Sequence, residues 1–564
     1  MRKRWTLLPA DEAAVNHLQE VLHINPVLCR LLVQRGITTF DQAKTFFRPD
    51  LTQLHDPFLM EDMDKAVERI ERAISQKEKI LLYGDYDVDG TTCVALLYSF
   101  LAAHYDRLDF YIPNRYSEGY GVSRQGVDYA AANDCSLVIA MDCGIRAVEK
   151  VAYANSLGID FIICDHHLPG PELPKAVAIL DPMRPDCLYP YKGLSGCGVV
   201  FKLAQAFTQK NDLPEAGLFD LLDILVLSIA ADIVPMTGEN RTLAFFGLER
   251  LSETGRLGLQ ALIEKSRRSK PLAISDIVFG LAPMINAAGR LDDAKLAVKL
   301  LLTTDETEAA KFARLLHHQN ELRKEHDLHI LREAKKKFEE MPAYQERKSI
   351  LLFDEHWHKG VVGIAAARMV EHYHRPTILL TQSNGMATGS ARSVAGFSIY
   401  DAIKECSDLL TNFGGHDHAA GMTLPIENVP SFQERFEKIV GEQIDEEMLV
   451  PELKLSAVLA LKDIDFKFWN ILRQFAPFGP GNRSPVFATK NVFDSGHSRL
   501  LKGDHVRVAV KQNDSVPVQG IAFGMGEHFS KIKSKKPFHI AYKIEEEKWQ
   551  DERTLSLVVR DLKF

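Results

Sequence analysis

Short apolar runs, each followed by acidic residues, recur through the first third of the chain. They end near positions 83, 141, 164 and 180 and are separated by stretches with helical periodicity. Such runs are typical of buried parallel strands that alternate with helices. The residues that follow them are Asp85, Asp87 and Asp89, then Asp142, then Asp165 with two histidines, and then Asp181. The pattern predicts an α/β domain over residues 61–302 whose carboxylates gather at one edge of its sheet.

The rest of the chain divides by pattern into five further regions. Residues 1–60 look mostly helical, and residues 303–340 form a charged stretch free of proline and glycine, which predicts a long connector helix. Strand patterns restart after it and predict a second, smaller α/β domain over 341–425, followed by a helical linker over 426–475. Closely spaced short strands predict an OB-like β-barrel over 476–564. The predicted architecture is two α/β domains joined by a long helix, plus this barrel.

Composition is typical of a multidomain protein of the cytoplasm. The chain has 564 residues, too many for one core, with 46% hydrophobic and 26% charged residues. No run approaches the roughly 18 apolar residues of a membrane helix, so no membrane association is expected. The eight cysteines include no C-x-x-C pair, which favours reduced thiols in a cytoplasmic protein over a disulfide framework. The net charge of −8 neither indicates nor excludes a nucleic-acid partner.

The segment Gly84–Gly90 places three aspartates within five residues behind an apolar strand. It is not an EF-hand loop, because position 12 counted from Asp85 is Leu96 and not glutamate. It is not a P-loop either, because no Gly-Lys-Ser/Thr follows. Carboxylates delivered to one edge from several strands repel one another unless a cation lies among them. Oxygens with one or two imidazoles suit Mn²⁺ or Mg²⁺, so the sequence predicts a metal site that holds two ions.

Two further segments add to this site. In Asp165-His166-His167 the adjacent histidines point in different directions, so one can bind metal while the other faces substrate. A surface histidine pair is more often simply solvated, but the position directly after an apolar strand favours a functional role. Asp232 lies in an apolar segment, where an unpaired carboxylate is costly. Either a cation or a helix cap would relieve that cost, and the cation is favoured.

Three segments rich in small residues deliver basic side chains. They are 286–290 with one arginine, 389–393 with another, and 412–421 with two histidines. Small residues beside arginine and histidine suit a backbone that approaches phosphates closely. Each segment alone is common in proteins, and the lysines at 531–536 are more simply explained as a solvated face.

The acidic motifs, in order, resemble those of the DHH phosphoesterase superfamily. Residues 415–421 resemble the signature of its companion DHHA1 domain, and residues 286–290 and 477–482 resemble the bacterial RecJ family. The resemblance covers nearly the whole chain. It implies a single-stranded-DNA-specific 5′→3′ exonuclease of DNA recombination and repair, which releases 5′-mononucleotides by two-metal phosphodiester hydrolysis.

The resemblance also implies roles for individual residues. Six would hold two Mn²⁺ or Mg²⁺ ions: Asp85, Asp87, Asp89, Asp142, His166 and Asp232. His167 would face the scissile phosphate, and with Asp142 and Asp87 it makes up the implied catalytic set. Substrate would be bound by residues of both α/β domains: Arg115 and Arg290 at the 5′-phosphate, Tyr120 near the terminal base, and Arg392 and His416 on the DHHA1 surface. The implied partners are single-stranded DNA and, as candidates, a single-strand-binding protein and a RecQ-type helicase.

Three alternatives stay open from the sequence. A DHH-DHHA1 phosphodiesterase of short oligonucleotides or cyclic dinucleotides would have the same site chemistry, but it would not be expected to carry the C-terminal barrel. An inorganic pyrophosphatase would be expected to be much shorter. A non-catalytic single-strand-binding scaffold is disfavoured because the acids are intact at every motif.

Overall fold

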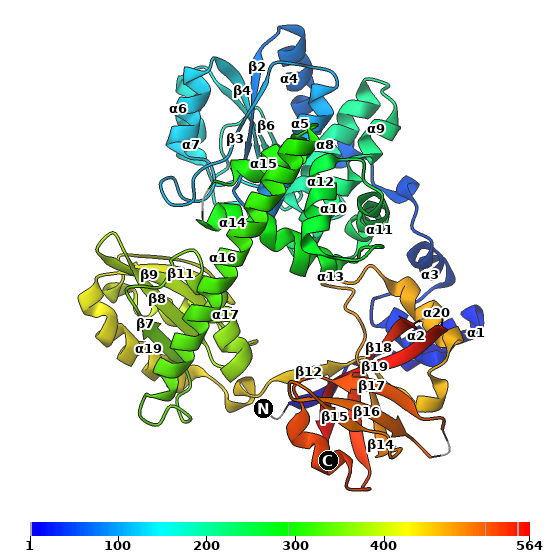
Figure 1. The fold of residues 1–564 in the computed structure, drawn as a ribbon. Coiled ribbons are helices and arrows are strands. Elements are labelled where there is room, and N and C mark those ends of the chain that lie inside the picture. The colour runs from blue at the N-terminus through cyan, green and yellow to red at the C-terminus, as the bar shows by residue number, and fades with distance from the viewer. Residues whose placement is uncertain (1–2, 292, 514, 550–551) are drawn as a thin grey trace.

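Three bodies surround a central opening in the computed structural model, which describes residues 3–291, 293–513, 515–549 and 552–564 (Figure 1). Helix α16 (Glu306–Glu339) runs from the first α/β domain to the second. At the opposite side, β1 (Arg4–Leu7) pairs in parallel with β12 (Glu452–Leu455). The chain therefore forms a ring, since its first strand lies beside the segment that leads into the C-terminal domain.

The first domain contains a five-stranded sheet with strand order β3-β2-β4-β5-β6. Its strands are β2 (Lys79–Gly84), β3 (Leu108–Tyr111), β4 (Cys135–Met141), β5 (Asp160–Cys164) and β6 (Ala178–Leu180). All four pairings are parallel, so the carboxyl ends of the strands share one edge. The four predicted runs form β2, β4, β5 and β6. The short strand β3 was not predicted, because it has only four residues and Asp109 interrupts its apolar character.

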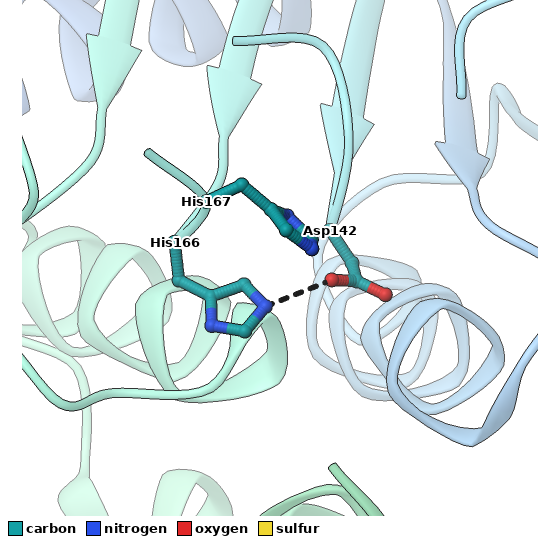
Figure 2. Close-up of side chains that lie close together, drawn as sticks. All are labelled: Asp142, His166 and His167. Atoms are coloured by element: carbon teal, nitrogen blue, oxygen red, sulfur yellow. Dashed lines mark hydrogen bonds and ion pairs between the residues drawn. The ribbon is translucent and has the colours of Figure 1, made fainter. Parts of the chain in front are cut away.

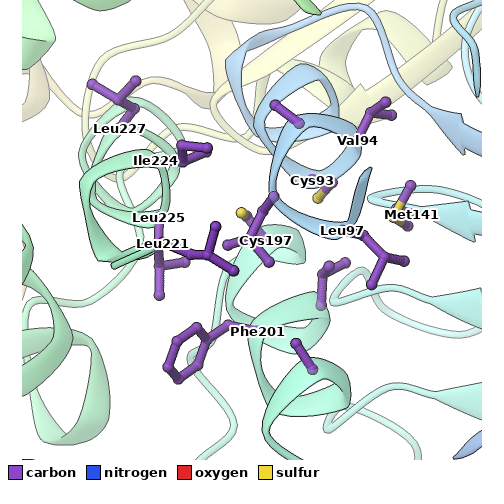
Figure 3. Packing of buried hydrophobic residues seen from close by; sticks show 14 of the residues in the cluster. Cys93, Val94, Leu97, Met141, Cys197, Phe201, Leu221, Ile224, Leu225 and Leu227 are labelled. Atoms are coloured by element: carbon purple, nitrogen blue, oxygen red, sulfur yellow. The ribbon is translucent and has the colours of Figure 1, made fainter. Parts of the chain in front are cut away.

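Helices cover this sheet and build a second layer beneath its carboxyl edge. They are α4 (Met63–Ser75), α5 (Val88–Ala102), α6 (Arg124–Ala132), α7 (Val148–Ser156), α8 (Gly196–Lys210), α9 (Glu215–Phe219), α10 (Leu222–Ala231), α11 (Gly238–Ser252), α12 (Leu257–Ser266), α13 (Ile274–Asp276), α14 (Ala282–Leu291) and α15 (Lys295–Leu302). Figure 3 shows Cys93 and Leu97 of α5 packed against Cys197 and Phe201 of α8 and Leu225 of α10. This core fixes the helix starts that lie next to the sheet edge.

The connector helix α16 is more deeply packed than its charged sequence indicates. Ala313 and Leu316 belong to the core of the first domain, whereas Ile330, Ala334 and Phe338 belong to a core of the second. A narrow apolar stripe along one face of the helix therefore fastens both domains to it. The long helix predicted between the two α/β domains is confirmed.

The second domain has a five-stranded mixed sheet with order β10-β11-β9-β8-β7. Its elements are β7 (Ile350–Phe353), α17 (Val362–Tyr373), β8 (Thr377–Ser383), β9 (Met386–Arg392), α18 (Ile399–Lys404), β10 (Asn412–His416), β11 (Ala419–Leu424) and α19 (Val429–Gln443). Phe432, Phe436 and Val440 of α19 share a core with Ile378 and Leu380 of β8. The stretch expected as a helical linker over 426–475 therefore begins with a helix, α19, whose apolar face is buried against this sheet.

The C-terminal domain is a closed barrel. Its strands are β13 (Ala457–Val458), β14 (Phe487–Asp494), β15 (Arg499–Leu501), β16 (His505–Lys511), β17 (Val518–Ala522), β18 (Phe538–Trp549) and β19 (Glu552–Lys563), with the short helix α21 (Phe529–Ile532) before β18. Strand β14 pairs with both β18 and β16, which closes a ring of five strands, β14-β18-β19-β17-β16. A closed five-stranded barrel is the architecture of OB domains, as predicted.

The N-terminal helices share a core with this barrel. They are α1 (Glu12–Leu22), α2 (Pro26–Val33) and α3 (Phe40–Phe47), and α20 (Phe466–Leu472) joins them. Most of the first 60 residues are helical, and they also contain the strand β1. Elements β13 and α20 precede residue 476 and pack in the same core as the barrel.

The described part of the chain has no helix that is both long enough and apolar enough to cross a membrane. All eight cysteines are buried and free.

A buried ion pair joins the N-terminal segment to the first domain. Lys202 of α8 is fully buried, and its Nζ donates to the carbonyl of His55 at 2.6 Å and to Oε1 of Glu239 at 3.1 Å. Glu239, at the start of α11, also accepts a hydrogen bond from the Tyr189 hydroxyl at 2.6 Å. Every charge in this cluster has a partner, which is the condition for burying it.

Replacing Lys202 with alanine should destabilise the first domain by about 3–5 kcal/mol, because Glu239 would keep its buried charge without a cation. Denaturant unfolding followed by circular dichroism measures the free energy of unfolding. The double variant Lys202→Met with Glu239→Gln removes both charges and should cost less than Lys202→Ala alone. Equal losses in the two variants would contradict this role of the ion pair.

Candidate metal centre

Seven polar side chains meet at the carboxyl edge of the first sheet. They come from the loop after β2 (Asp85, Asp87), the start of α5 (Asp89), the end of β4 (Asp142), the turn after β5 (His166, His167) and the end of α10 (Asp232). They form three groups whose donor atoms lie within 4.8 Å of one another: Asp85, Asp87 and Asp142; Asp89, His166 and Asp232; and Asp142, His166 and His167. All six residues expected to bind metal lie in these groups.

The sheet itself delivers these residues to one place. The backbone N–H of Asp142 donates to the Cys164 carbonyl at 2.9 Å, so the parallel ladder continues to the first residue of the motif. The loop after β2 turns so tightly that a side chain at Gly90 would come within 2.4 Å of the Asp85 backbone. On the other side, a side chain at Gly289 of α14 would lie 2.4 Å from the Tyr86 carbonyl oxygen. The absence of side chains at these two glycines thus lets the Asp85–Asp87 segment lie close against both α5 and α14.

The electrostatics of this cluster call for cations. Burial, followed by the charge of Asp87, raises the pKa of Asp85 to about 8. Burial and the charges of Asp89 and Asp87 likewise raise the pKa of Asp232 to about 8. Asp85 is fully buried, and neither of its carboxylate oxygens has a hydrogen-bond partner among the described residues. Unpaired oxygens and imidazoles at this spacing are the ligand set that Mn²⁺ and Mg²⁺ use, so the residues fit the expected ions.

Asp89 differs from the other carboxylates in the cluster. Its oxygens accept hydrogen bonds from the backbone N–H groups of Gly196 (2.7 Å) and Cys197 (2.9 Å), at the start of α8, and from the Ser228 hydroxyl (2.7 Å). The carboxylate therefore caps one helix and ties it to α10. These bonds leave it fewer free lone pairs than Asp85, although one of its oxygens lies 3.7 Å from Nε2 of His166.

The two histidines have different partners (Figure 2). Nε2 of His166 lies 3.2 Å from Oδ1 of Asp142, inside the cluster. Nδ1 of His167 lies 2.7 Å from Oδ1 of Asp165, and its Nε2 lies 3.2 Å from the Tyr120 hydroxyl. Burial lowers the pKa of His167, but the hydrogen bond and charge of Asp165 outweigh it and raise the pKa to about 9. Asp165 therefore favours the protonated imidazole of His167, which lies beside the acidic cluster.

Arginines gather where the two α/β domains meet. Arg115 lies over the ring of Tyr86, with 5.2 Å from its Cζ to the ring centroid, and Arg290 donates to the Gly360 carbonyl at 3.1 Å across the domain boundary. Burial lowers the pKa of Arg290 to about 10, and the nearby charges of Arg115, Arg323 and Arg392 add to this effect. Cations that repel one another at the edge of a metal site are suited to an anionic substrate.

The remaining predicted residues lie at different depths. Arg392, on β9, donates to the Ser390 hydroxyl at 2.7 Å and faces the arginine group. His416 is exposed on the edge strand β10, where its Nδ1 accepts from the His418 N–H at 3.2 Å. Within the described residues, no contact links His416 to the metal cluster.

Several supporting residues had not been identified from the sequence as part of the site. Asp165 accepts from the Ile145 N–H at 3.0 Å as well as from His167, and Asn286 accepts from the Val88 N–H at 3.1 Å. Asp165 and Asn286 had a signal in the sequence, because they stand inside the histidine motif and the 286–290 segment. Ser228 and Arg323 had none of their own, although Ser228 precedes Asp232 on α10. These two join the site through contacts between segments far apart in the chain.

Comparison with known proteins agrees with this geometry. Three family models match in order: "DHH family, N-terminal domain" over residues 79–229, "DHHA1 domain" over 347–442 and "RecJ OB domain" over 455–561. The single-stranded-DNA-specific exonuclease RecJ of Salmonella typhimurium is 34% identical over 95% of this chain and 96% of its own length. The chain belongs to the RecJ family.

Other RecJ proteins are similar in sequence and in fold. RecJ of Bacillus subtilis is 37% identical over 99% of this chain and 71% of its own length. The crystal structure of RecJ from Thermus thermophilus in complex with Mn²⁺ has a TM-score of 0.85, with 28% identity over 100% of this chain and 79% of that one. A second structure of the same RecJ contains Mg²⁺. The RecJ OB match covers the C-terminal barrel, which the alternative short-oligonucleotide phosphodiesterase was not expected to carry.

Replacing Gly289 with alanine should lower Mn²⁺ affinity about 10- to 100-fold, as loss of a supporting contact in a metal site does. The added methyl group would collide with the Tyr86 carbonyl and displace the Asp85–Asp87 segment. Isothermal titration calorimetry with Mn²⁺ measures this effect. Gly217→Ala is the control, because nothing lies within 4 Å of a side chain added there. Wild-type affinity in Gly289→Ala would show that α14 does not position the ligands.

Proposed function

We propose that this RecJ-family chain is a metal-dependent exonuclease that degrades single-stranded DNA from its 5′ end and releases 5′-mononucleotides. One observation carries the proposal above the others. A cluster of buried carboxylates and imidazoles that needs cations faces a group of arginines suited to a terminal phosphate. This pairing is what an enzyme requires to hold a phosphate end and to cleave the next phosphodiester bond.

The proposed division of labour follows from the contacts of each side chain. Asp85, Asp87, Asp142, His166 and Asp232 would hold two Mn²⁺ or Mg²⁺ ions, with Asp89 serving mainly to fix α5 against α8. When bound, such ions supply an activated water and stabilise the leaving oxygen. No covalent nucleophile is needed for this chemistry.

His167 has the next role in the proposal. Because its pKa is raised to about 9, its imidazolium would donate a hydrogen bond to a non-bridging oxygen of the scissile phosphate. Asp165 orients the ring through Nδ1, which leaves Nε2 free to exchange Tyr120 for the phosphate. Tyr120 is more than half exposed beside His167, where it would stack on the terminal base.

The direction of digestion would be set by the arginine group. Arg115, Arg290 and Arg392 would bind the 5′-phosphate, so the distance from this group to the metal cluster sets which bond is cut. If a single nucleotide fits between the arginine group and the metal cluster, the product is a mononucleotide and digestion proceeds 5′→3′. His416 lies further out on the DHHA1 domain and would contact the strand beyond the cleavage site.

Selectivity for single strands would come from the ring. An open cavity of about 2,080 Å³ lies between the bodies and is lined by residues of the first domain, the β12 segment and the barrel. Ile233, directly after Asp232, contributes to its wall. The barrel carries exposed Phe523 next to His505, a pairing suited to stacking with unpaired bases.

Further expectations follow from family membership alone. We propose a single-strand-binding protein and a RecQ-type helicase as partners, and a cytoplasmic location in keeping with eight free, buried thiols. We also propose four functional units. These are a DHH domain over 61–302, a connector over 303–340, a DHHA1 domain over 341–443, and a C-terminal domain that includes the N-terminal helices.

Replacing Asp142 with alanine should abolish cleavage while sparing DNA binding. The expected loss in rate is on the order of a thousandfold, because several kcal/mol of charge stabilisation disappear. Release of a 5′ label from single-stranded DNA measures cleavage, and fluorescence anisotropy in chelator measures binding. Asp64→Ala, at an exposed position of α4, is the matched control. Unchanged cleavage in Asp142→Ala would overturn the metal assignment.

Replacing Arg290 with glutamine should remove the preference for a 5′-phosphate over a 5′-hydroxyl. The rate on phosphorylated strands should fall on the order of tenfold or more, since truncating one partner of a buried charge contact costs about that much. The rate on hydroxylated strands should change much less. Arg314→Gln, an exposed arginine of α16, is the control. If Arg290→Gln slowed both substrates equally, the arginine would not be reading the terminal phosphate.

A further inference from the structure

A second cavity, of about 510 Å³, lies apart from the metal centre where three parts of the chain meet. Its walls come from the turn after α2, from α3, from residues 53 and 55, from the start of α11, and from the turn at 481–482. Its volume is within the range of pockets that hold small organic ligands. None of the residues assigned to the metal centre or the arginine group lines it.

A buried arginine, Arg241, and a half-buried one, Arg35, both line this cavity, and neither forms an ion pair with a carboxylate among the described residues. Arg241 of α11 is only 5% exposed; its Nη2 donates to the carbonyls of Gln474 and Ala476, and its Nε has no partner among the described residues. Arg35 donates through Nε to the Asn482 side chain at 2.6 Å, and its other hydrogen bonds go to backbone carbonyls. Burial, followed by the charge of Arg35, lowers the pKa of Arg241 to about 10. A buried guanidinium with a free donor and a cationic neighbour calls for an anion.

The N-terminus of α11 opens into the same cavity. Thr237 occupies the cap position but makes no side-chain hydrogen bond to the helix, because its hydroxyl pairs with the Tyr191 hydroxyl at 3.1 Å. Thr237, Gly238 and Glu239 all line the cavity. A helix of 15 residues without a side-chain cap presents free N–H groups and a partial positive charge, which suit a phosphate.

Two carboxylates of the lining do not offset this charge. Glu239 is satisfied by Lys202, Tyr189 and the His55 N–H, as described above. Asp41 is exposed at the rim. The interior of the cavity therefore has an excess of positive charge.

We propose that this cavity binds a nucleoside monophosphate, with its phosphate at Arg241 and the start of α11. The volume exceeds the need of inorganic phosphate alone. Ile37 and Phe46 provide apolar surface for a base, with Cζ of Arg241 3.9 Å from the Phe46 ring centroid, and Gln42 and Gln53 provide amides for its edges. The ligand would brace the N-terminal helices against the first domain at the joint that closes the ring. The same chemical class contains the reaction product, and only that link rests on the proposed function.

Binding can be measured without catalysis. The test uses the full chain carrying Asp142→Ala, in chelator, so that neither metal-bound product nor turnover contributes. Thermal unfolding and equilibrium dialysis are recorded with dAMP, with deoxyadenosine and with inorganic phosphate. One equivalent of dAMP should bind and raise the melting temperature, because a ligand that binds only the folded state stabilises it. Deoxyadenosine should give no shift, and inorganic phosphate a smaller one.

Variants at Thr45 test whether dAMP binds in this cavity. Thr45 lies on the exposed side of the cavity, away from the hydrogen bonds that Arg241 makes to residues 474 and 476. Thr45→Glu should weaken dAMP binding by about tenfold or more, because a like charge would face the phosphate. Thr45→Gln, of matching size, should bind dAMP as the parent does.

Three outcomes would overturn the proposal: no saturable binding of dAMP, equal binding by the Thr45→Glu and Thr45→Gln variants, or equal shifts with dAMP and inorganic phosphate. None of these results depends on nuclease activity. Failure of the exonuclease assignment would instead appear as a wild-type chain that cleaves no DNA with metal present, beside intact dAMP binding in the Asp142→Ala chain.

Discussion

Repulsion among buried carboxylates at one sheet edge is the constraint on which the rest of this structure depends. A parallel sheet brings Asp85, Asp87 and Asp142 together because its strand ends share an edge. Burial and mutual repulsion raise the pKa values of all three carboxyl groups, so their charged forms are unfavourable without a cation. Asp89 is stabilised differently, because two backbone N–H groups at the start of a helix and a serine hydroxyl donate hydrogen bonds to its carboxylate. Metal binding and helix capping thus stabilise one cluster by complementary means.

The ring provides the second body that cleavage from the end of a DNA strand requires. A metal cluster alone would cleave any phosphodiester bond that reached it, so end recognition requires a second body. Helix α16 fastens the DHHA1 domain to the DHH domain along an apolar stripe, and Arg290 bonds to Gly360 across the boundary. On the opposite side, the pairing of β1 with β12 and the buried cluster of Lys202 and Glu239 close the ring.

The sequence predicted the local features well and the distant contacts poorly. The strand runs and their acidic ends were readable because apolar periodicity and motif spacing are properties of neighbouring residues. The role of Ser228, the placement of α19 and the strand β1 were not, because each depends on a partner far along the chain. Asp89 was expected among the metal ligands from the family resemblance. Only its contacts with Gly196 and Cys197 reveal that it also caps a helix.

The most direct test of the central claim is digestion of a long single-stranded DNA, labelled at either end, beside its blunt duplex. The reactions contain Mn²⁺, Mg²⁺ or chelator. The 5′ label should be released immediately as a mononucleotide, only with metal and only from the single strand. Attack on the duplex, release from the 3′ end, or cleavage in chelator would contradict it. Binding without cleavage under either metal would show that the carboxylate cluster does not form a working metal centre.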